Sequence, residues 1–181
     1  MKIKRIATIC KSQKKAELWT RPDHRGEVAA QYILAGRAVY RMQGMPVMEA
    51  EHLLGLFDIP GKDRDDWQLE NRMADDTLCN LADTESGEKE ADLPNIIIQW
   101  HGESYRPVIT CRGLAVVNTE YFSPLDTADG HFTIMERMNA AGKVYLAAKV
   151  GLILQAVIFP EEIPEGMQQE ISRTFGGIGN E

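Results

Sequence analysis

Cysteine and histidine are scarce in this chain of 181 residues. The three cysteines are far apart and form no C-x-x-C pair, and the four histidines are scattered. Structural metal sites and disulfide frameworks need clustered or paired ligands, so the sequence predicts no metal site, no disulfide and no cofactor. Cys10, Cys79 and Cys111 are expected to be small core residues of a protein in a reducing compartment, the cytoplasm.

The chain also lacks a long apolar run that is free of charge. Residues 144–163, VYLAAKVGLILQAVIFPEEI, form the longest apolar stretch, but Lys149 lies near its centre. A membrane-spanning helix needs roughly 20 apolar residues and tolerates a central lysine poorly, so we expect no membrane segment. The basic amino terminus lacks the apolar core of a signal peptide, so none is expected. The stretch could be a buried helix or two adjacent strands. Alternating apolar positions and β-branched residues favour the two strands, with a turn at Gly151.

No catalytic motif in the sequence has complete spacing. Residues 101–105, HGESY, approach the G-x-S-x-G turn of hydrolase nucleophiles, but Arg106 stands where the second glycine is needed. The same residues are typical of a hairpin turn between two strands. We therefore expect a non-enzymatic protein, and the alternative is an enzyme with a dispersed active site. The members of such a site would be His101, Glu103 and Asp129.

Short strands separated by turns are the main pattern that the sequence does show. Besides the two strands of the longest apolar stretch, strands are predicted at residues 2–11, 15–20, 31–42, 95–102, 105–113, 114–118 and 131–138. Long helices do not alternate with these strands, which argues against a doubly wound fold. The sequence therefore predicts an α+β fold, mainly antiparallel sheet with two or three short helices.

Short helices are expected in three places. Residues 48–60 place four apolar side chains at the i, i+3, i+4 and i+7 positions of one buried face: Ala50, Leu53, Leu54 and Phe57. Residues 65–83 and 165–175 have helical patterns as well, and Asn118 is expected to cap a helical turn.

Acidic residues are concentrated in the middle of the chain. Residues 62–92 hold eleven acids and four bases, a net charge of −7 that equals the net charge of the whole chain. The stretch 84–92 is expected to be a mobile surface loop. We therefore predict a single domain, residues 1–181, of two sub-halves, about 1–60 and 94–181, joined by the acidic segment 61–93.

Basic residues are concentrated at the amino terminus, where the first 41 residues carry ten bases and three acids. These bases either contact the phosphates of DNA or are solvated edge-strand residues that prevent aggregation. The candidate phosphate contacts are Lys2, Lys4, Arg5, Lys11, Lys14, Lys15, Arg21 and Arg25. The acidic segment 62–92 is expected to oppose binding of DNA and to compete for the same surface.

Three stretches resemble a group of uncharacterised bacterial proteins encoded by prophages and other mobile elements. They are AGRAVYRMQGMP (35–46), LFDIP (56–60) and LAAKVGLILQAVIFP (146–160). The resemblance spans most of the chain. It implies a cytoplasmic accessory protein and assigns no activity.

Residues 114–160 are similar to the repeat unit of sliding clamps, the processivity factors of DNA polymerases. In that repeat a short helix is followed by strands, and the last strand closes on a proline. The corresponding positions here are Asn118, Tyr121, Phe122 and Pro160. The resemblance implies a clamp-like factor of DNA metabolism, with DNA or replication and mobile-element proteins as partners, and an oligomer. A pure protein-interaction scaffold is a further alternative.

Overall fold

The computed structural model describes residues 2–125, 132–163, 166–167 and 171. The helices with fully described bounds are α1 (Ile3–Gln13) and α2 (His52–Leu56), which are α-helices, and η1 (Gly61–Asp66) and η2 (Thr119–Phe122), which are 3-10 helices. The described residues 166–167 and 171 are also helical. The strands are β1 (Lys15–Pro22), β2 (Val28–Ala35), β3 (Ala38–Arg41), β4 (Gln68–Met73), β5 (Lys89–Ala91), β6 (Ile98–Trp100), β7 (Glu103–Thr110), β8 (Gly113–Asn118), β9 (Thr133–Met138), β10 (Val144–Val150) and β11 (Ile153–Ile158). The predicted α+β fold with mainly antiparallel sheet is confirmed.

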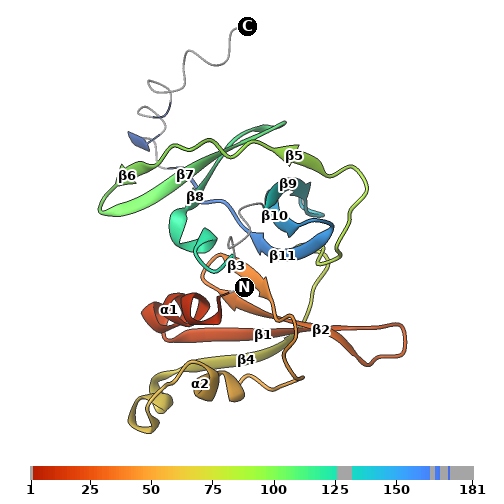
Figure 1. The fold of residues 1–181 in the computed structure, drawn as a ribbon, viewed down its shortest axis with the longest axis vertical. Coiled ribbons are helices and arrows are strands. Elements are labelled where there is room, and N and C mark those ends of the chain that lie inside the picture. Colours follow the sequence, from red (N-terminus) through yellow and green to blue (C-terminus); the bar gives the residue numbers. More distant parts are fainter. Residues whose placement is uncertain (1, 126–131, 164–165, 168–170, 172–181) are drawn as a thin grey trace, which may run out of the picture.

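An eight-stranded sheet runs through the molecule in the order β4-β1-β2-β3-β11-β10-β9-β5, and β6-β7-β8 form a separate sheet. Each end of the chain contributes a helix followed by a three-stranded meander, α1-β1-β2-β3 and η2-β9-β10-β11 (Figure 1). The two meanders meet where β3 pairs antiparallel with β11, with Val39 opposite Val157. One sheet therefore joins both predicted sub-halves, whose boundaries stay a prediction.

Alternation along the strands gives the large sheet two apolar faces. Leu18, Ile33 and Tyr40 belong to one buried cluster, which α1, α2, η2 and the small sheet cover; we call this side the helical face. Their neighbours Trp19 and Tyr32 belong to a second cluster on the opposite side. Because successive side chains of a strand point to opposite faces, a single run of apolar residues can supply both cores.

The segment 2–11, predicted as a strand, is helical, so that prediction is wrong. Four side chains of α1 are buried against the sheet: Ile6, Ala7, Ile9 and Cys10. Their spacing of one, three and four residues is that of a helix face, whereas a strand would bury every second residue. The helix ends at Gln13, and the next residue, Lys14, adopts the left-handed conformation with φ of 49°.

The other helix predictions have different outcomes. The predicted apolar face of residues 48–60 is buried as expected, although α2 itself is shorter than that range. Asn118 caps η2, as predicted, because its side chain accepts a hydrogen bond from the amide of Glu120 at 3.0 Å. The predicted helix 165–175 lies largely outside the described residues.

The prediction of a helix at 65–83 is wrong. Residues 68–73 form β4, which pairs parallel with β1. Residues 74–88, which we call the strap, then cross the second apolar face, where Cys79 and Leu81 join the buried cluster. The stretch 84–92 is not a mobile loop, because two of its carboxylates, Glu85 and Glu88, are bound to cations of the sheet and Lys89–Ala91 form β5.

Arg137 of β9 holds the strap in place. Its buried guanidinium donates hydrogen bonds to the backbone carbonyls of Asn80 (3.0 Å), Ala82 (2.9 Å) and Asp83 (3.3 Å). It also forms an ion pair with Glu88, at 2.6 Å. The strap is therefore attached through both its backbone and its charge.

The longest apolar stretch forms β10 and β11, with a turn that includes Gly151, as predicted. Lys149, near its centre, is buried and forms an ion pair with Glu88 of the strap. Among the described residues, no helix is long and apolar enough to cross a membrane.

Gly36, in the turn between β2 and β3, is expected to tolerate no side chain. Its φ is 60°, and an added Cβ would lie 2.7 Å from the hydroxyl of buried Tyr121 and 3.1 Å from the amide nitrogen of Gln13. Gly36→Ala should therefore cost about 1–3 kcal/mol for the backbone alone, and more for the displaced ring. Gly151→Ala is the matched control, because φ is 59° there but the space is open. Urea unfolding that gives equal losses for both variants would contradict the packing argument.

Candidate nucleic-acid interface

The structure brings five of the eight predicted phosphate contacts together on one element. They lie on α1 or at its two ends: Lys2, Lys4, Arg5, Lys11 and Lys14. The other three are separated from one another, because Lys15 begins β1, Arg21 lies near its far end, and Arg25 lies in the loop between β1 and β2.

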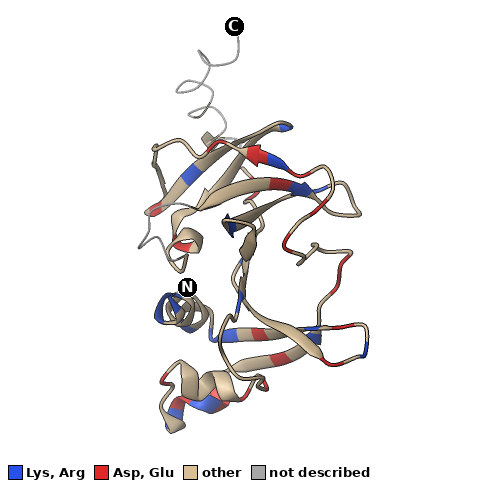
Figure 2. Ribbon diagram, turned by 45° about the vertical axis from the view of Figure 1, so that its right-hand side comes forward, with Lys and Arg blue, Asp and Glu red and all other residues tan. Residues whose placement is uncertain are grey.

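A continuous polar stripe runs along the outer side of α1. Its exposed members follow each other at helical spacing: Lys4, Arg5, Thr8, Lys11 and Ser12. Figure 2 shows basic residues and no acidic residue along α1. Both hydroxyls bond back to the helix, Thr8 to the carbonyl of Lys4 and Ser12 to that of Ile9. The stripe therefore combines three basic side chains with two neutral hydroxyls, and it contains no carboxylate.

The cations differ in whether a carboxylate neutralises them. Lys14 forms an exposed ion pair with Asp66 of η1 at 2.7 Å, and this hydrogen bond raises the pKa of Lys14. Lys15 pairs with Glu17 at 2.9 Å. In the part of the chain that the structure describes, the three cations within the range of α1 have no ion-pair partner: Lys4, Arg5 and Lys11.

The strap, one part of the acidic segment, does not lie where the expected competition for this surface would place it. The strap covers the face of the sheet opposite α1, where Glu88 is bound to Arg137 and Lys149. Only the η1 residue Asp66 pairs with a cation of α1, namely Lys14. The sheet thus separates the bases of α1 from the five acids of the strap, out of the eleven acids in 62–92.

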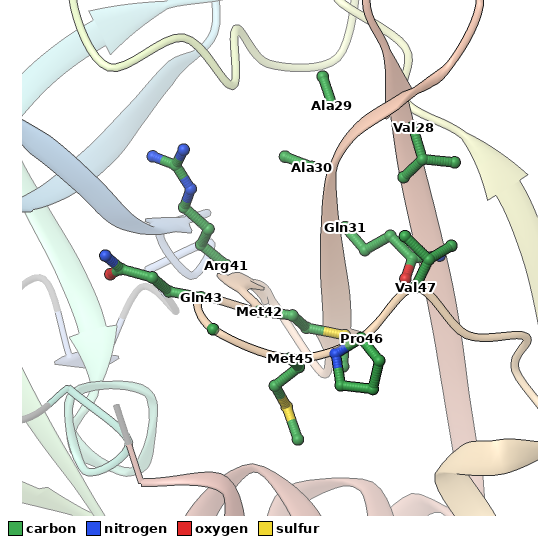
Figure 3. Close-up of a pocket in the computed structure, with 11 residues that line it drawn as sticks. Val28, Ala29, Ala30, Gln31, Arg41, Met42, Gln43, Met45, Pro46 and Val47 are labelled. Atoms are coloured by element: carbon green, nitrogen blue, oxygen red, sulfur yellow. The ribbon is translucent and has the colours of Figure 1, made fainter.

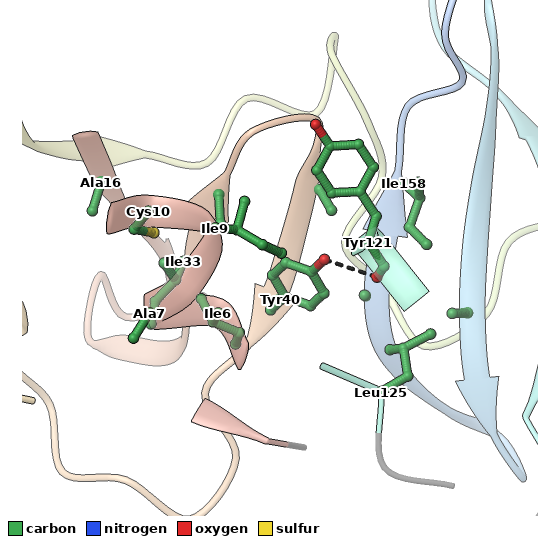
Figure 4. Close-up of a cluster of buried hydrophobic side chains, with 14 of the residues drawn as sticks. Ile6, Ala7, Ile9, Cys10, Ala16, Ile33, Tyr40, Tyr121, Leu125 and Ile158 are labelled. Atoms are coloured by element: carbon green, nitrogen blue, oxygen red, sulfur yellow. Dashed lines mark hydrogen bonds between the residues drawn. The ribbon is translucent and has the colours of Figure 1, made fainter. Parts of the chain in front are cut away.

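The helix η2 lies next to α1 on the helical face (Figure 4). The amide of Lys2 donates to the carbonyl of Pro124 at 2.8 Å, and the hydroxyl of Tyr40 donates to the carbonyl of Tyr121 at 2.8 Å. Of the positions that resemble a clamp repeat, Phe122 stacks on Phe132, with ring centroids 6.1 Å apart. The carbonyl of Pro160 accepts a hydrogen bond from Arg37 at 2.6 Å.

Three carboxylates near η2 were not singled out together from the sequence: Glu103, Glu120 and Glu161. Burial raises the pKa of Glu120, and the nearby charge of Glu103 raises it further. Burial also raises the pKa of Glu161, which Arg37 opposes and the other two carboxylates reinforce. These residues lie 17 to 58 positions apart in the sequence, so no local pattern could have grouped them.

The alternative prediction was an enzyme whose dispersed active site includes His101, Glu103 and Asp129. The two of these residues that the structure describes are engaged with neighbouring side chains. Glu103 accepts hydrogen bonds from the hydroxyl of Tyr105 at 2.5 Å and from the amide of Asn118 at 3.3 Å. His101 lies in the turn between β6 and β7, with its ring edge-on to Trp100 at 4.9 Å. Asp129 lies outside the described residues.

Two cysteines follow the prediction and one does not. Cys10 and Cys79 are buried, and burial raises the pKa of each thiol to about 12. Cys111 is exposed in the turn between β7 and β8, so its prediction as a core residue is wrong. Its amide donates to the buried carboxylate of Glu136 at 2.6 Å, and Arg112 forms an ion pair with the same carboxylate.

Comparisons with protein-family models, curated proteins and solved structures gave no match. Among the residues with a described position, no group of three or more histidine, cysteine, aspartate or glutamate side chains could hold a metal ion. The chemistry on which a functional argument can rest is therefore that of the α1 surface itself.

Proposed function

We propose that this protein is a non-enzymatic accessory factor that contacts the phosphates of DNA through the exposed stripe of α1. The observation that carries the proposal is that Lys4, Arg5 and Lys11 share one side of a helix without a carboxylate partner among the described residues. An unneutralised row of cations is the electrostatic feature by which proteins bind a nucleic acid backbone without reading its sequence.

The dimensions of the stripe favour a small number of contacts. The helix has 11 residues, a length of about 16 Å, and seven residues between Lys4 and Lys11 correspond to about 10 Å along its axis. Such a stripe reaches a few neighbouring phosphates of one strand. Binding by one copy of the chain is therefore weak, and it depends steeply on salt because each contact releases counterions.

The repeated order of helix and three-stranded meander supports the clamp-like form of the proposal. Both α1 and η2 lie on the same face of one continuous sheet, and the meanders that follow them pair through β3 and β11. In this form the protein is a clamp-like factor of a mobile element, and several copies together present enough α1 surfaces to hold DNA. A protein-interaction scaffold uses the same fold without binding phosphate, so the two are separated by a binding measurement.

Fluorescence anisotropy with a labelled duplex and a labelled single strand tests the proposal. For three phosphate contacts, affinity for the duplex should fall roughly 40-fold between 50 and 200 mM salt. The triple variant Lys4→Glu, Arg5→Glu, Lys11→Glu should lose binding. The control variant Arg25→Glu, Lys89→Glu, Lys143→Glu has the same net charge but changes exposed bases away from α1. It includes Arg25, a predicted contact that the structure separates from the stripe, and it should keep most of the binding.

Two outcomes would overturn the proposal. If the control variant loses binding as completely as the α1 variant, net charge and not the stripe is responsible. If the wild-type chain binds neither probe at low salt, and native mass measurement shows a monomer, the clamp-like factor is excluded and the scaffold remains.

A further inference from the structure

The strands β2 and β3 separate at one end and leave a wedge-shaped cavity between them. Their ladder ends with Tyr32 opposite Arg41, and one more bond follows, from the amide of Met42 to the carbonyl of Gln31 at 2.9 Å. Beyond this bond, residues 43–47 leave the sheet while residues 28–30 continue beside β1. The cavity between them has a volume of about 230 Å³ (Figure 3).

The wedge is held open by a glutamine side chain. The buried amide of Gln31 donates to the carbonyl of Met48 at 2.8 Å and accepts from the amide of Met48 at 2.9 Å. These two hydrogen bonds take the place of the backbone hydrogen bonds that a further residue of β3 would make. They also hold the end of the loop 43–47 against β2. A third bond, to the hydroxyl of Thr20 at 3.2 Å, fixes the glutamine itself.

The walls of the wedge differ in chemistry. One wall is the backbone of Val28–Ala30, which has no strand beside it on the β3 side among the described residues. The opposite wall, residues 42–47, combines the apolar side chains of Met42, Met45, Pro46 and Val47 with the polar Gln43 and backbone groups. Two apolar side chains at the opening are well exposed, Val28 at 40% and Val47 at 65%. The only charged side chain in the lining is Arg41, which extends to one side of the opening (Figure 3).

The guanidinium of Arg41 already binds a carboxylate of this chain. It pairs with Asp83 of the strap at 2.5 Å, and the side chain of Asp83 is 46% exposed. The side chain of Arg41 therefore points to the face of the sheet that the strap covers. The side chain of Gln31, which bonds to Thr20, points to the opposite, helical face. The wedge lies in the plane of the sheet between these two sides.

We propose that the wedge binds an extended peptide segment of a partner protein, which adds as a short strand beside Val28–Ala30. An exposed strand edge accepts an extended backbone, and pockets beside it select alternate side chains. A cavity of this size is smaller than the roughly 300–1,000 Å³ of sites for drug-sized ligands, which favours single side chains of a peptide.

The two sides of the sheet determine the sequence that such a peptide needs. Successive side chains of a strand point to opposite faces, so a residue beside Val28 and Val47 is apolar and its neighbour meets Arg41. Arginine prefers a carboxylate, and Asp83 occupies that place in the free protein. The recognised segment is thus an alternation of apolar and acidic residues whose carboxylate replaces Asp83. The inference does not depend on binding of DNA by α1.

Titration with synthetic octapeptides tests this inference. An octapeptide of alternating valine and glutamate should bind and shift the backbone amide resonances of Val28 to Gln31, whereas an alternating valine and lysine octapeptide should not. Val47→Glu should weaken binding at least tenfold, since it places a charge on the apolar wall. Leu152→Glu is the control, because Leu152 is 76% exposed elsewhere and its change should leave affinity unaltered.

A further variant tests the role of the internal carboxylate. Asp83→Asn keeps an acceptor for the amide of Leu154, to which Asp83 bonds at 3.0 Å, but it removes the negative charge that pairs with Arg41 and so competes less for it. It should strengthen binding of the valine–glutamate peptide severalfold. Absence of binding at millimolar peptide, equal binding of the lysine peptide, or no effect of Val47→Glu would each overturn the inference.

Discussion

Replacement of Arg137 by methionine is expected to lower the free energy of unfolding by about 3–5 kcal/mol, the usual cost of removing one partner from a buried ion pair. The side chain of Arg137 is fully buried, and its partner Glu88 is 13% exposed. The whole protein is expected to be stable by only about 5–15 kcal/mol. This one change should therefore remove a large share of its stability.

The loss comes mainly from the strap, which methionine cannot hold. Three backbone carbonyls that now accept from the guanidinium would lose their donor: those of Asn80, Ala82 and Asp83. These hydrogen bonds are partly buried, and each acceptor that stays out of water without a donor costs about 1–3 kcal/mol, unless the strap lifts and water reaches it. The variant is therefore expected to expose the apolar cluster beneath the strap and to bind hydrophobic dyes before it unfolds.

Arg41→Met is the control for this prediction, since Arg41 also pairs with the strap but at the surface. The side chains of Arg41 and Asp83 are 25% and 46% exposed, and such pairs contribute at most about 1 kcal/mol. Urea unfolding of both variants gives the comparison. If Arg137→Met proves no more destabilising than Arg41→Met, the strap is not held by the buried guanidinium.

Most of the strands could be predicted from the sequence, but β4 and β5 could not. In residues 144–158 every even position is apolar, whereas Lys149, Gly151 and Gln155 all fall at odd positions, and this period is a property of the strand itself. The alternation could not show that the second side is also buried. Lys149 is polar in the sequence and buried in the structure because Glu88, 61 positions away, neutralises it.

The helix α1 was mistaken for a strand because local propensity and tertiary packing disagree there. Isoleucine and threonine favour strands locally, yet the buried residues include Ile6, Ile9 and Cys10 at helical spacing. The difference matters for the candidate site. A strand would place Lys4 and Lys11 on opposite faces, because seven is an odd number of residues, whereas a helix places them on one side. The charges were visible in the sequence, but their common surface was not.

The acidic segment shows why composition alone misjudges order. A stretch with many carboxylates and few apolar residues is typical of a mobile loop. Here the cations that bind it come from β9 and β10, so the order of 84–92 depends on Arg137 and Lys149. No pattern inside the segment itself reports those partners.

Acid is expected to destabilise the protein below about pH 4.5, because three buried or nearly buried carboxylates have lowered pKa values in the folded state. Burial alone would raise the pKa of Glu136, but hydrogen bonds from Cys111 and Arg112 outweigh it, so the pKa lies below its ordinary value of 4.5. Hydrogen bonds from Lys15 and Trp19 lower the pKa of Glu17 in the same way. Those from Lys149 and Arg137 lower the pKa of Glu88.

The sign of the effect follows from proton binding. A carboxylate with a lowered pKa binds fewer protons in the folded than in the unfolded chain, so its contribution is complete above pH 4.5 and is lost as pH falls through the folded value. Glu120 and Glu161 have raised pKa values and act in the opposite direction. Their contribution to the free energy of unfolding therefore grows as pH falls towards 4.5. The free energy of unfolding should therefore rise slightly from neutral pH to a maximum near pH 5 and then fall steeply.

The variants Glu136→Gln and Glu161→Gln separate these two contributions. Glu136→Gln should cost about 1.5–3 kcal/mol at pH 7, the value of hydrogen bonds to a charged group, because Glu136 is buried and bonded to Cys111 and Arg112. Below pH 4.5 its stability should fall less steeply than that of the wild type, since one titrating group has been removed. Glu161→Gln should flatten the rise above pH 4.5 and leave the fall below it unchanged. Urea unfolding from pH 3 to 8 measures all three curves, and a Glu136→Gln curve parallel to the wild type at low pH would show that this carboxylate does not control acid stability.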